Sequence, residues 1–338
     1  ARAERARRFD RALEAVSLAW QQVLVEHGRL VARDRRRRGA LMWGLSLDET
    51  SADRLRDLDS IAAGVKASGA DWVRVVFGVP RGDLTFARRD SFNPYDALIV
   101  ALERRKLRVM GSVLDSMLWP PGLTPELYAE RTRHLAEHYK RQVRLWEVAS
   151  EPDGNWLGGD KPLDPEDVLL CVQKGVVAVK EVDPKLETAA TLQWWDGTAP
   201  DGRHGLYDWL PWAVKRGFGA GIDLVGLSLY PHRNPVGLAL EPAFRELRAE
   251  LPGKRYFLAG WSFGDQGQTP PYWWLDPKAV DGPRKDLTTL FTAAAPALVP
   301  ESVGGGFFWP TLEQMLPAGL QPTSLYRVYK KTLREDAR

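Results

Sequence analysis

The stretch TPELYAERTRHLAEHYKRQVRLWEVASE, residues 124–151, contains a helical pattern followed directly by a strand pattern. Its first part, residues 124–140, is amphipathic with helical periodicity. Its second part, Val143–Glu151, is a short apolar run rich in β-forming residues. Alternating helices and buried strands are typical of an α/β fold. The same alternation is therefore expected in the rest of the chain.

The same alternation extends in both directions from this stretch, from residue 41 almost to the end of the chain. The candidate strands are Leu41–Leu47, Trp72–Gly78, Leu107–Asp115, Val143–Glu151, Glu187–Trp195, Ile222–Tyr230, Arg255–Phe263 and Val303–Pro310. Helical patterns lie at 51–69, 92–105, 124–140, 165–182, 206–216, 238–250, 286–298 and 322–335. Eight strand–helix units predict a single closed (β/α)₈ TIM barrel of the α/β class.

A doubly wound nucleotide-binding sheet is disfavoured, because no Gly-rich phosphate turn follows the first strand. The glycines Gly304–Gly306 lie inside the last strand, where close packing in a barrel explains them better. The single cysteine, Cys171, excludes a Cys-rich metal site, and no metal motif of useful specificity is present. We therefore expect no cofactor.

The segment before the barrel differs in composition from the rest. Residues 1–33 have apolar residues at helical spacing, with Gly28 as a candidate point of interruption. The run Arg35–Arg38 follows as a linker. We therefore divide the chain into a basic N-terminal helix and Arg-rich linker, 1–38, and a barrel, 39–338. A solvated linker is the main interpretation of the arginines, and a weak contact between residues 33–38 and an anionic surface is the alternative.

The charge is unevenly distributed along the 338 residues. The chain has 47 Lys and Arg against 44 Asp and Glu, a net charge of +3. Residues 1–38 hold eleven Arg and five acidic residues, a net of +6, which leaves −3 for the barrel. A slightly acidic barrel argues against nucleic acid as the partner. No run approaches eighteen apolar residues, so we expect no transmembrane segment.

Polar and aromatic residues follow most of the predicted strands, at the end of a barrel where active sites lie. Fourteen tryptophans are many for this length. Indole rings stack on the C–H faces of sugars, so this composition favours a cleft for a poly- or oligosaccharide. The candidate substrate-binding residues are Arg74, Asp115, Trp119, Ser150, Trp156, Trp194, Trp195, Tyr230, His232, Trp261 and Trp309.

The fourth strand carries the most specific signal, the octapeptide Trp146–Asp153. With it, residues 41–335 resemble clan A of the retaining glycoside hydrolases, and most of all its xylosidase-like and agarase-like members. In that clan a Glu-Pro pair at the end of strand 4 carries the general acid/base, which the resemblance assigns to Glu151. The clan also tends to carry an arginine on strand 2, an aromatic residue on strand 6 and a tryptophan on strand 8. Arg74, Tyr230 and Trp309 occupy these places here.

Two positions depart from the clan pattern. The asparagine that precedes the acid/base is replaced by Ser150. The nucleophilic glutamate expected at the end of strand 7 is also missing, since one alignment puts Gly260 at its position and another puts Leu258 there. Without that carboxylate, the pair of carboxyl groups that retention needs is incomplete.

Three explanations for the missing nucleophile stay open. The chain is an engineered nucleophile variant, another carboxylate serves, or the site has decayed and the barrel only binds glycan. The other carboxylates on the same rim are Asp48, Asp115, Asp196, Asp265 and Glu313. The function expected is therefore a glycoside hydrolase for a β-linked glycan, with an inactive glycan-binding barrel (a pseudoenzyme) as the alternative.

Three further expectations follow. Glu147 faces the barrel interior in a buried ion pair, for which Arg74 or a neighbour of Arg144 is the candidate partner. The histidines His134 and His138 form a surface pair rather than a metal site. A polysaccharide substrate favours a secreted or periplasmic protein whose leader has been removed, with a cytoplasmic location left open.

Overall fold

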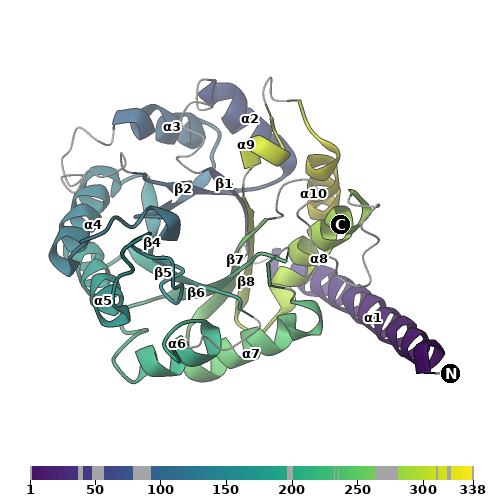
Figure 1. Cartoon of the computed structure of the whole chain (residues 1–338). Coiled ribbons are helices and arrows are strands. Elements are labelled where there is room, and N and C mark those ends of the chain that lie inside the picture. Colours follow the sequence, from purple (N-terminus) through teal and green to yellow (C-terminus); the bar gives the residue numbers. More distant parts are fainter. Residues whose placement is uncertain are drawn as a thin grey trace.

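Eight parallel strands form a closed barrel in which each strand pairs with the next along the chain and β8 pairs with β1. The strands are β1 (Met42–Leu47), β2 (Trp72–Val76), β3 (Arg108–Ser112), β4 (Val143–Ser150), β5 (Glu187–Gln193), β6 (Leu224–Leu229), β7 (Arg255–Trp261) and β8 (Ser302–Phe308). All eight predicted strands are present; β1 ends where predicted, and the other seven end slightly before their predicted ends. The prediction of a (β/α)₈ barrel is therefore confirmed (Figure 1).

The computed structural model describes residues 2–36, 41–47, 57–78, 93–195, 201–231, 233–234, 236–262, 281–309, 311–317 and 321–336. The described α-helices are α1 (Arg2–Arg36), α2 (Leu58–Ser68), α3 (Asn93–Arg104), α4 (Pro125–Tyr139), α5 (Pro165–Val182), α6 (Leu206–Val214), α7 (Leu240–Glu250), α8 (Asp281–Ala294), α9 (Thr311–Gln314) and α10 (Ser324–Glu335). Short 3₁₀ helices are η3 (Ser116–Leu118), η4 (Gly237–Ala239) and η5 (Ala295–Ala297). Helices surround the barrel, and α1 extends away from it (Figure 1).

Local sequence signals explain where the helices begin. Before α4, the Thr124 hydroxyl accepts a hydrogen bond from the Leu127 amide at 3.3 Å. Before α5, the Asp164 carboxylate accepts one from the Glu166 amide at 2.9 Å. In both helices a proline occupies the first turn, where its missing N–H costs nothing. These caps determine the residues at which α4 and α5, the helices after β3 and β4, begin.

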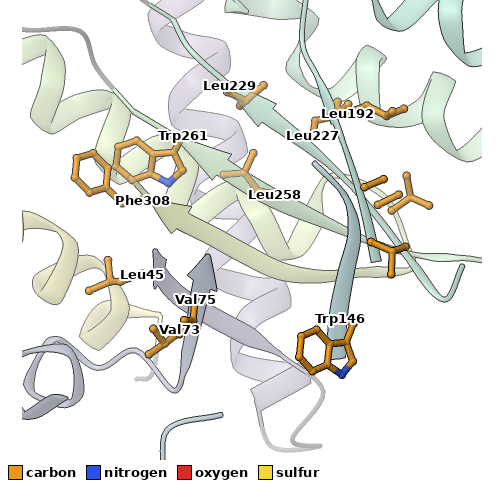
Figure 2. Packing of buried hydrophobic residues seen from close by; sticks show 14 of the residues in the cluster. Leu45, Val73, Val75, Trp146, Leu192, Leu227, Leu229, Leu258, Trp261 and Phe308 are labelled. Carbon is orange, nitrogen blue, oxygen red and sulfur yellow. The ribbon is translucent and has the colours of Figure 1, made fainter. Parts of the chain in front are cut away.

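Side chains alternate between the interior of the barrel and the layer between barrel and helices. The interior has a separate apolar cluster, most of whose members lie in the first half of their strands, made of Met42, Trp72, Met110, Leu145, Ala189, Leu224, Phe257, Ala259 and Phe307. The outward-facing residues pack against the helices, and Figure 2 shows several of them, including Trp146 and Trp261. The apolar cluster closes one end of the barrel and leaves the C-terminal end for polar residues.

Two glycines let backbones approach closely. A Cβ at Gly28 of α1 would lie 1.9 Å from the Ala293 carbonyl oxygen of α8. The helix therefore continues through Gly28 to Arg36, and the expected interruption is wrong. In β8, Gly305 has a φ of 106° and a Cβ there would lie 2.3 Å from the Leu258 oxygen. This confirms that the β8 glycines serve barrel packing.

Among the helices of the described ranges, none is both long enough and apolar enough to cross a membrane.

Candidate active site

Glu151 follows β4 directly, and its carboxyl group is the centre of the polar residues at this rim. Its backbone amide donates to the Thr191 oxygen of β5 at 2.7 Å. One carboxyl oxygen accepts hydrogen bonds from the Ser228 and Tyr230 hydroxyls, both at 2.6 Å. The other accepts one from the Ser116 hydroxyl at 2.9 Å. Residues at the ends of three strands, β3, β4 and β6, thus converge on one carboxyl group.

Burial raises the pKa of Glu151 above its ordinary value, and the negative charge of Asp115 raises it further. The three hydroxyl donors act in the opposite direction, because they stabilise the ionised form. The net direction is upward. A glutamate with a raised pKa at a barrel mouth suits a group that donates a proton near neutral pH.

Arg74 of β2 is buried in the barrel beside Glu147 of β4. Its Nε donates to Glu147 Oε2 at 2.8 Å, and the Thr191 hydroxyl donates to Oε1 at 2.5 Å. Burial works against the charge of Arg74, but the nearby carboxylates of Glu147 and Asp115 outweigh it and raise its pKa. The expected buried ion pair between Glu147 and Arg74 is confirmed.

The guanidinium of Arg74 also reaches the rim. Its Nη2 lies 3.2 Å from the Ser112 hydroxyl, 3.3 Å from the Ser150 hydroxyl and 3.5 Å from Asp115 Oδ2. Asp115 also caps η3 by accepting from the Met117 amide at 3.1 Å. Arg74 therefore connects the interior ion pair to a second carboxylate beside Glu151.

Asp115 and Glu151 differ in exposure. The Asp115 side chain is 27% exposed, whereas Glu151 is 6% exposed. Asp115 immediately precedes Ser116, whose hydroxyl is bonded to Glu151. The site thus contains a buried carboxyl group and, next to it, a partly exposed one in contact with an arginine.

Gly260 of β7 lies opposite Ser228 in the pairing of β6 with β7. A Cβ at Gly260 would meet only the Phe307 oxygen at 3.7 Å and Ser228 Cβ at 3.9 Å, which are ordinary contacts. Because the Ser228 hydroxyl binds Glu151, a longer side chain at position 260 would start next to the Glu151 carboxyl group. The position therefore has room for a Cβ, the first atom of the side chain that the clan pattern leads us to expect.

Asp153 is a buried acid that the sequence did not single out. It is 1% exposed and accepts from the Gln193 amide at 2.9 Å. Burial raises its pKa to about 8. Its place two residues after Glu151 was visible in the sequence, but its burial depends on the course of the loop after β4.

Three of the expected sugar-binding tryptophans are buried instead. Trp261 is fully buried outside the barrel wall, with its ring 4.6 Å from that of Phe308 (Figure 2). It points outward because it follows Gly260 along the strand. Trp119 is 2% exposed against Tyr128, and Trp194 is 3% exposed. These three rings are not placed to stack on a sugar.

The remaining expected residues fall into three groups. Trp156, Trp195, Tyr230 and Trp309 are half-buried, so their expected contacts with substrate stay predictions. His232 and the carboxylates Asp48, Asp196 and Asp265 lie outside the described residues. Glu313 lies on α9 with its side chain exposed.

The described ranges contain no group of three His, Cys, Asp or Glu residues that could hold a metal ion. His138 lies 2.7 Å from the Asp96 carboxylate on α3 and is 22% exposed. This contact between two helices accounts for His138 without a metal.

No family model matches the sequence, and no curated protein matches it. Solved structures do match over most of the chain. Family 1 β-glucosidase from Thermotoga maritima is 11% identical with a TM-score of 0.64, over 88% of this chain and 98% of that one. Virulence factor SghA from Agrobacterium tumefaciens is 12% identical with a TM-score of 0.63, over 94% and 100%. Native xylanase 10B from Thermotoga maritima is 11% identical with a TM-score of 0.59, over 90% and 98%.

These structures include family 10 xylanases and family 1 β-glucosidases, members of the clan that the sequence resembles. The resemblance is therefore confirmed for the fold. At 11–14% identity it says nothing about which residues act, so the chemistry must be argued from the site itself.

Proposed function

We propose that this barrel is a glycoside hydrolase for β-linked poly- or oligosaccharides and that Glu151 is its general acid. The observation that carries the proposal is the Glu151 carboxyl group itself. It is buried at the C-terminal rim, bound by three hydroxyl groups, and has a raised pKa. A protonated carboxyl group in such a place can give its proton to the oxygen of a leaving sugar.

The second carboxylate that glycoside hydrolysis requires is, in this proposal, Asp115. It lies on the neighbouring strand end and reaches solvent, and its charge contributes to the raised pKa of Glu151. With Glu151 as acid, Asp115 either attacks the anomeric carbon or takes a proton from the attacking water. The anomeric configuration of the first product distinguishes these roles.

The half-buried rings Trp156, Trp195 and Trp309 are proposed as the surfaces on which sugar rings stack. A polysaccharide substrate also supports the proposal that the protein works outside the cytoplasm.

The main experiment compares hydrolysis of a panel of β-linked polysaccharides and aryl β-glycosides by the parent and by Glu151→Gln. A matched control is Glu130→Gln, an exposed acid on the outer helix α4. We expect the parent and the control to be active, and Glu151→Gln to be slower by about 10²–10⁴-fold. Equal rates for parent and Glu151→Gln would refute the assignment.

A second arm tests Asp115 and Gly260 with a small anion. Asp115→Asn should lose activity, and azide should restore it if Asp115 is the nucleophile. Stimulation of the parent by azide, together with activity gained in Gly260→Glu, would instead show that the Gly260 position lacks its nucleophile. The proposed role of Asp115 would then be wrong.

A second candidate function is glycan binding without hydrolysis. It is favoured by Gly260, which provides no carboxylate, and by Ser150, whose hydroxyl contacts Arg74. If calorimetry detects glycan binding while hydrolysis is absent for the parent and for Gly260→Glu, the barrel is a binding protein.

A further inference from the structure

Helix α1 has one face that packs on its own barrel. Ser17, Leu24 and Ala32 are 4%, 6% and 0% exposed, and Gly28 lies against Ala293 of α8. These positions recur at helical spacing along one side of the helix. This face of α1 is therefore buried against the barrel, and its burial holds the helix in place.

A second stripe on α1 is largely apolar and, apart from the half-buried Leu13, exposed. We call it the seam, and it consists of Phe9, Leu13, Val16, Trp20, Val23, His27 and Leu30. Its members are separated alternately by four and three residues. Phe9, Val16, Val23 and Leu30 are 68%, 57%, 54% and 63% exposed. Exposed apolar residues in such a regular array point to a partner.

The seam and the packed face do not coincide. At roughly 100° per residue, the seam is turned by about a quarter of a turn from the face that contacts α8. The N-terminal half of α1 also extends beyond the barrel (Figure 1). A partner could therefore cover the seam along this half, while Ser17 and Leu24, which directly follow the seam residues Val16 and Val23, stay packed on the chain's own barrel.

The spacing of the seam identifies the kind of partner. An average of 3.5 residues between members is the repeat of a coiled coil, with Phe9, Val16, Val23 and Leu30 at d positions and Leu13, Trp20 and His27 at a positions. A helix lying on a membrane has a broader apolar face. Acidic Asp10 and Glu26 also border this seam, which disfavours an anionic lipid surface.

Charges beside the seam favour a second copy of this chain. In a parallel coiled coil, a g residue meets the e residue five positions later in the partner helix. Arg5 is at a g position, Asp10 is the matching e residue, and both are exposed. The next two g positions hold small residues, Ala12 and Ala19, and the e positions that match them belong to the packed face of α1.

We propose that two copies of this chain pair through the seam, with their α1 helices parallel. The proposal is independent of the chemistry at the barrel rim. The two barrels would lie on opposite sides of the paired helices, because the two-fold axis of a parallel pair turns the packed faces of the two α1 helices in opposite directions.

The test is analytical ultracentrifugation of the full chain over about 1–100 µM, a range that covers weak to moderate dimers. Val16→Glu and Val23→Glu should raise the dimer dissociation constant by about ten-fold or more, because each buries a charge in the interface. Leu18→Glu is the matched control, since Leu18 is 50% exposed on the same helix but lies outside the seam. Circular dichroism and thermal unfolding check that the variants stay folded.

Charge exchange tests the parallel arrangement. Arg5→Asp and Asp10→Arg should each weaken the dimer, and the double variant should restore it. A parent that is monomeric throughout this concentration range overturns the proposal. So does an equal loss in Leu18→Glu, or a monomeric parent that sediments with anionic phosphatidylserine vesicles.

Discussion

The backbone at Glu151 has a φ of 52°, a left-handed conformation that residues other than glycine rarely adopt. The bond from its amide to the Thr191 oxygen and the three hydroxyl bonds to its carboxyl group hold it there. Strained conformations of this kind are found preferentially at functional sites. The strain turns the side chain away from the course of β4 and into the cluster of hydroxyl groups.

The pKa of Glu151 can be moved in both directions. Asp115→Asn should lower it, because a neighbouring negative charge is removed, whereas Tyr230→Phe should raise it, because a donor to the ionised form is lost. Infrared titration of the carboxyl band measures both, with Glu151→Gln identifying the band. Shifts of the same sign in the two variants would contradict this account of the site.

The free space at Gly260 has a measurable consequence for stability. Gly260→Ala should be neutral or stabilising by up to about 1 kcal/mol, since a Cβ there meets only ordinary contacts. Gly305→Ala should cost about 2 kcal/mol or more, since φ is 106° and a Cβ would lie 2.3 Å from a backbone oxygen. Denaturation by urea measures both, and similar losses would show that position 260 is not open.

At the scale of elements, the alternation of patterns was sufficient to predict the fold. The run Val143–Glu151 and the helix before it, like the other units, lie where the sequence placed them. The local caps at Thr124 and Asp164 explain this, because they depend only on neighbouring residues. The closure of the barrel followed from the number of units.

The direction of side chains near the strand ends was harder to predict. In β4 the register shifts between Glu147 and Ala149, so Glu147 and Ser150, three residues apart, both reach Arg74. Simple alternation would put them on opposite faces. Such irregularities depend on the neighbouring strands, and the same limit explains why sequence alone did not show which tryptophans are buried.

The ion pair between Arg74 and Glu147 joins β2 to β4 inside the barrel. Glu147→Gln should reduce the free energy of unfolding by about 3–5 kcal/mol, because Arg74 then lacks its main counter-charge in a buried place. The exposed pair of Arg203 with Asp164 provides the control, and Arg203→Gln should cost at most about 1 kcal/mol. Chemical denaturation compares the two, and equal costs would contradict the structural role given to the interior pair.

For the molecule as a whole, the two ends of the barrel differ in the polarity of their interior side chains. Apolar side chains fill the end at which the strands begin, and the ionisable groups collect at the end at which they finish. Burial of acids at that end has a cost for the folded state whenever they are ionised. The arrangement therefore couples the stability of the barrel to pH.

Asp153 makes this coupling testable. Its pKa is raised to about 8 in the folded protein, well above the value of 3.8 for a free aspartate. The folded state thus holds a proton that the unfolded chain has lost, and stability falls as pH rises from about 4 to about 8. In Asp153→Asn, the decrease in the free energy of unfolding between these pH values should be smaller by a few kcal/mol. Urea denaturation at several pH values measures it, and identical pH profiles for parent and variant would contradict the burial of a protonated Asp153.

The most direct test of Glu151 as proton donor is the dependence of hydrolysis on the leaving group. Rates are compared for the parent and Glu151→Gln on β-glycosides with good and poor leaving groups, such as dinitrophenyl and alkyl glycosides. Poor leaving groups need the proton, so the account predicts a loss of about 10²–10⁴-fold for alkyl glycosides and little loss for dinitrophenyl glycosides. Equal losses for both substrates, or no hydrolysis of either by the parent, would contradict it.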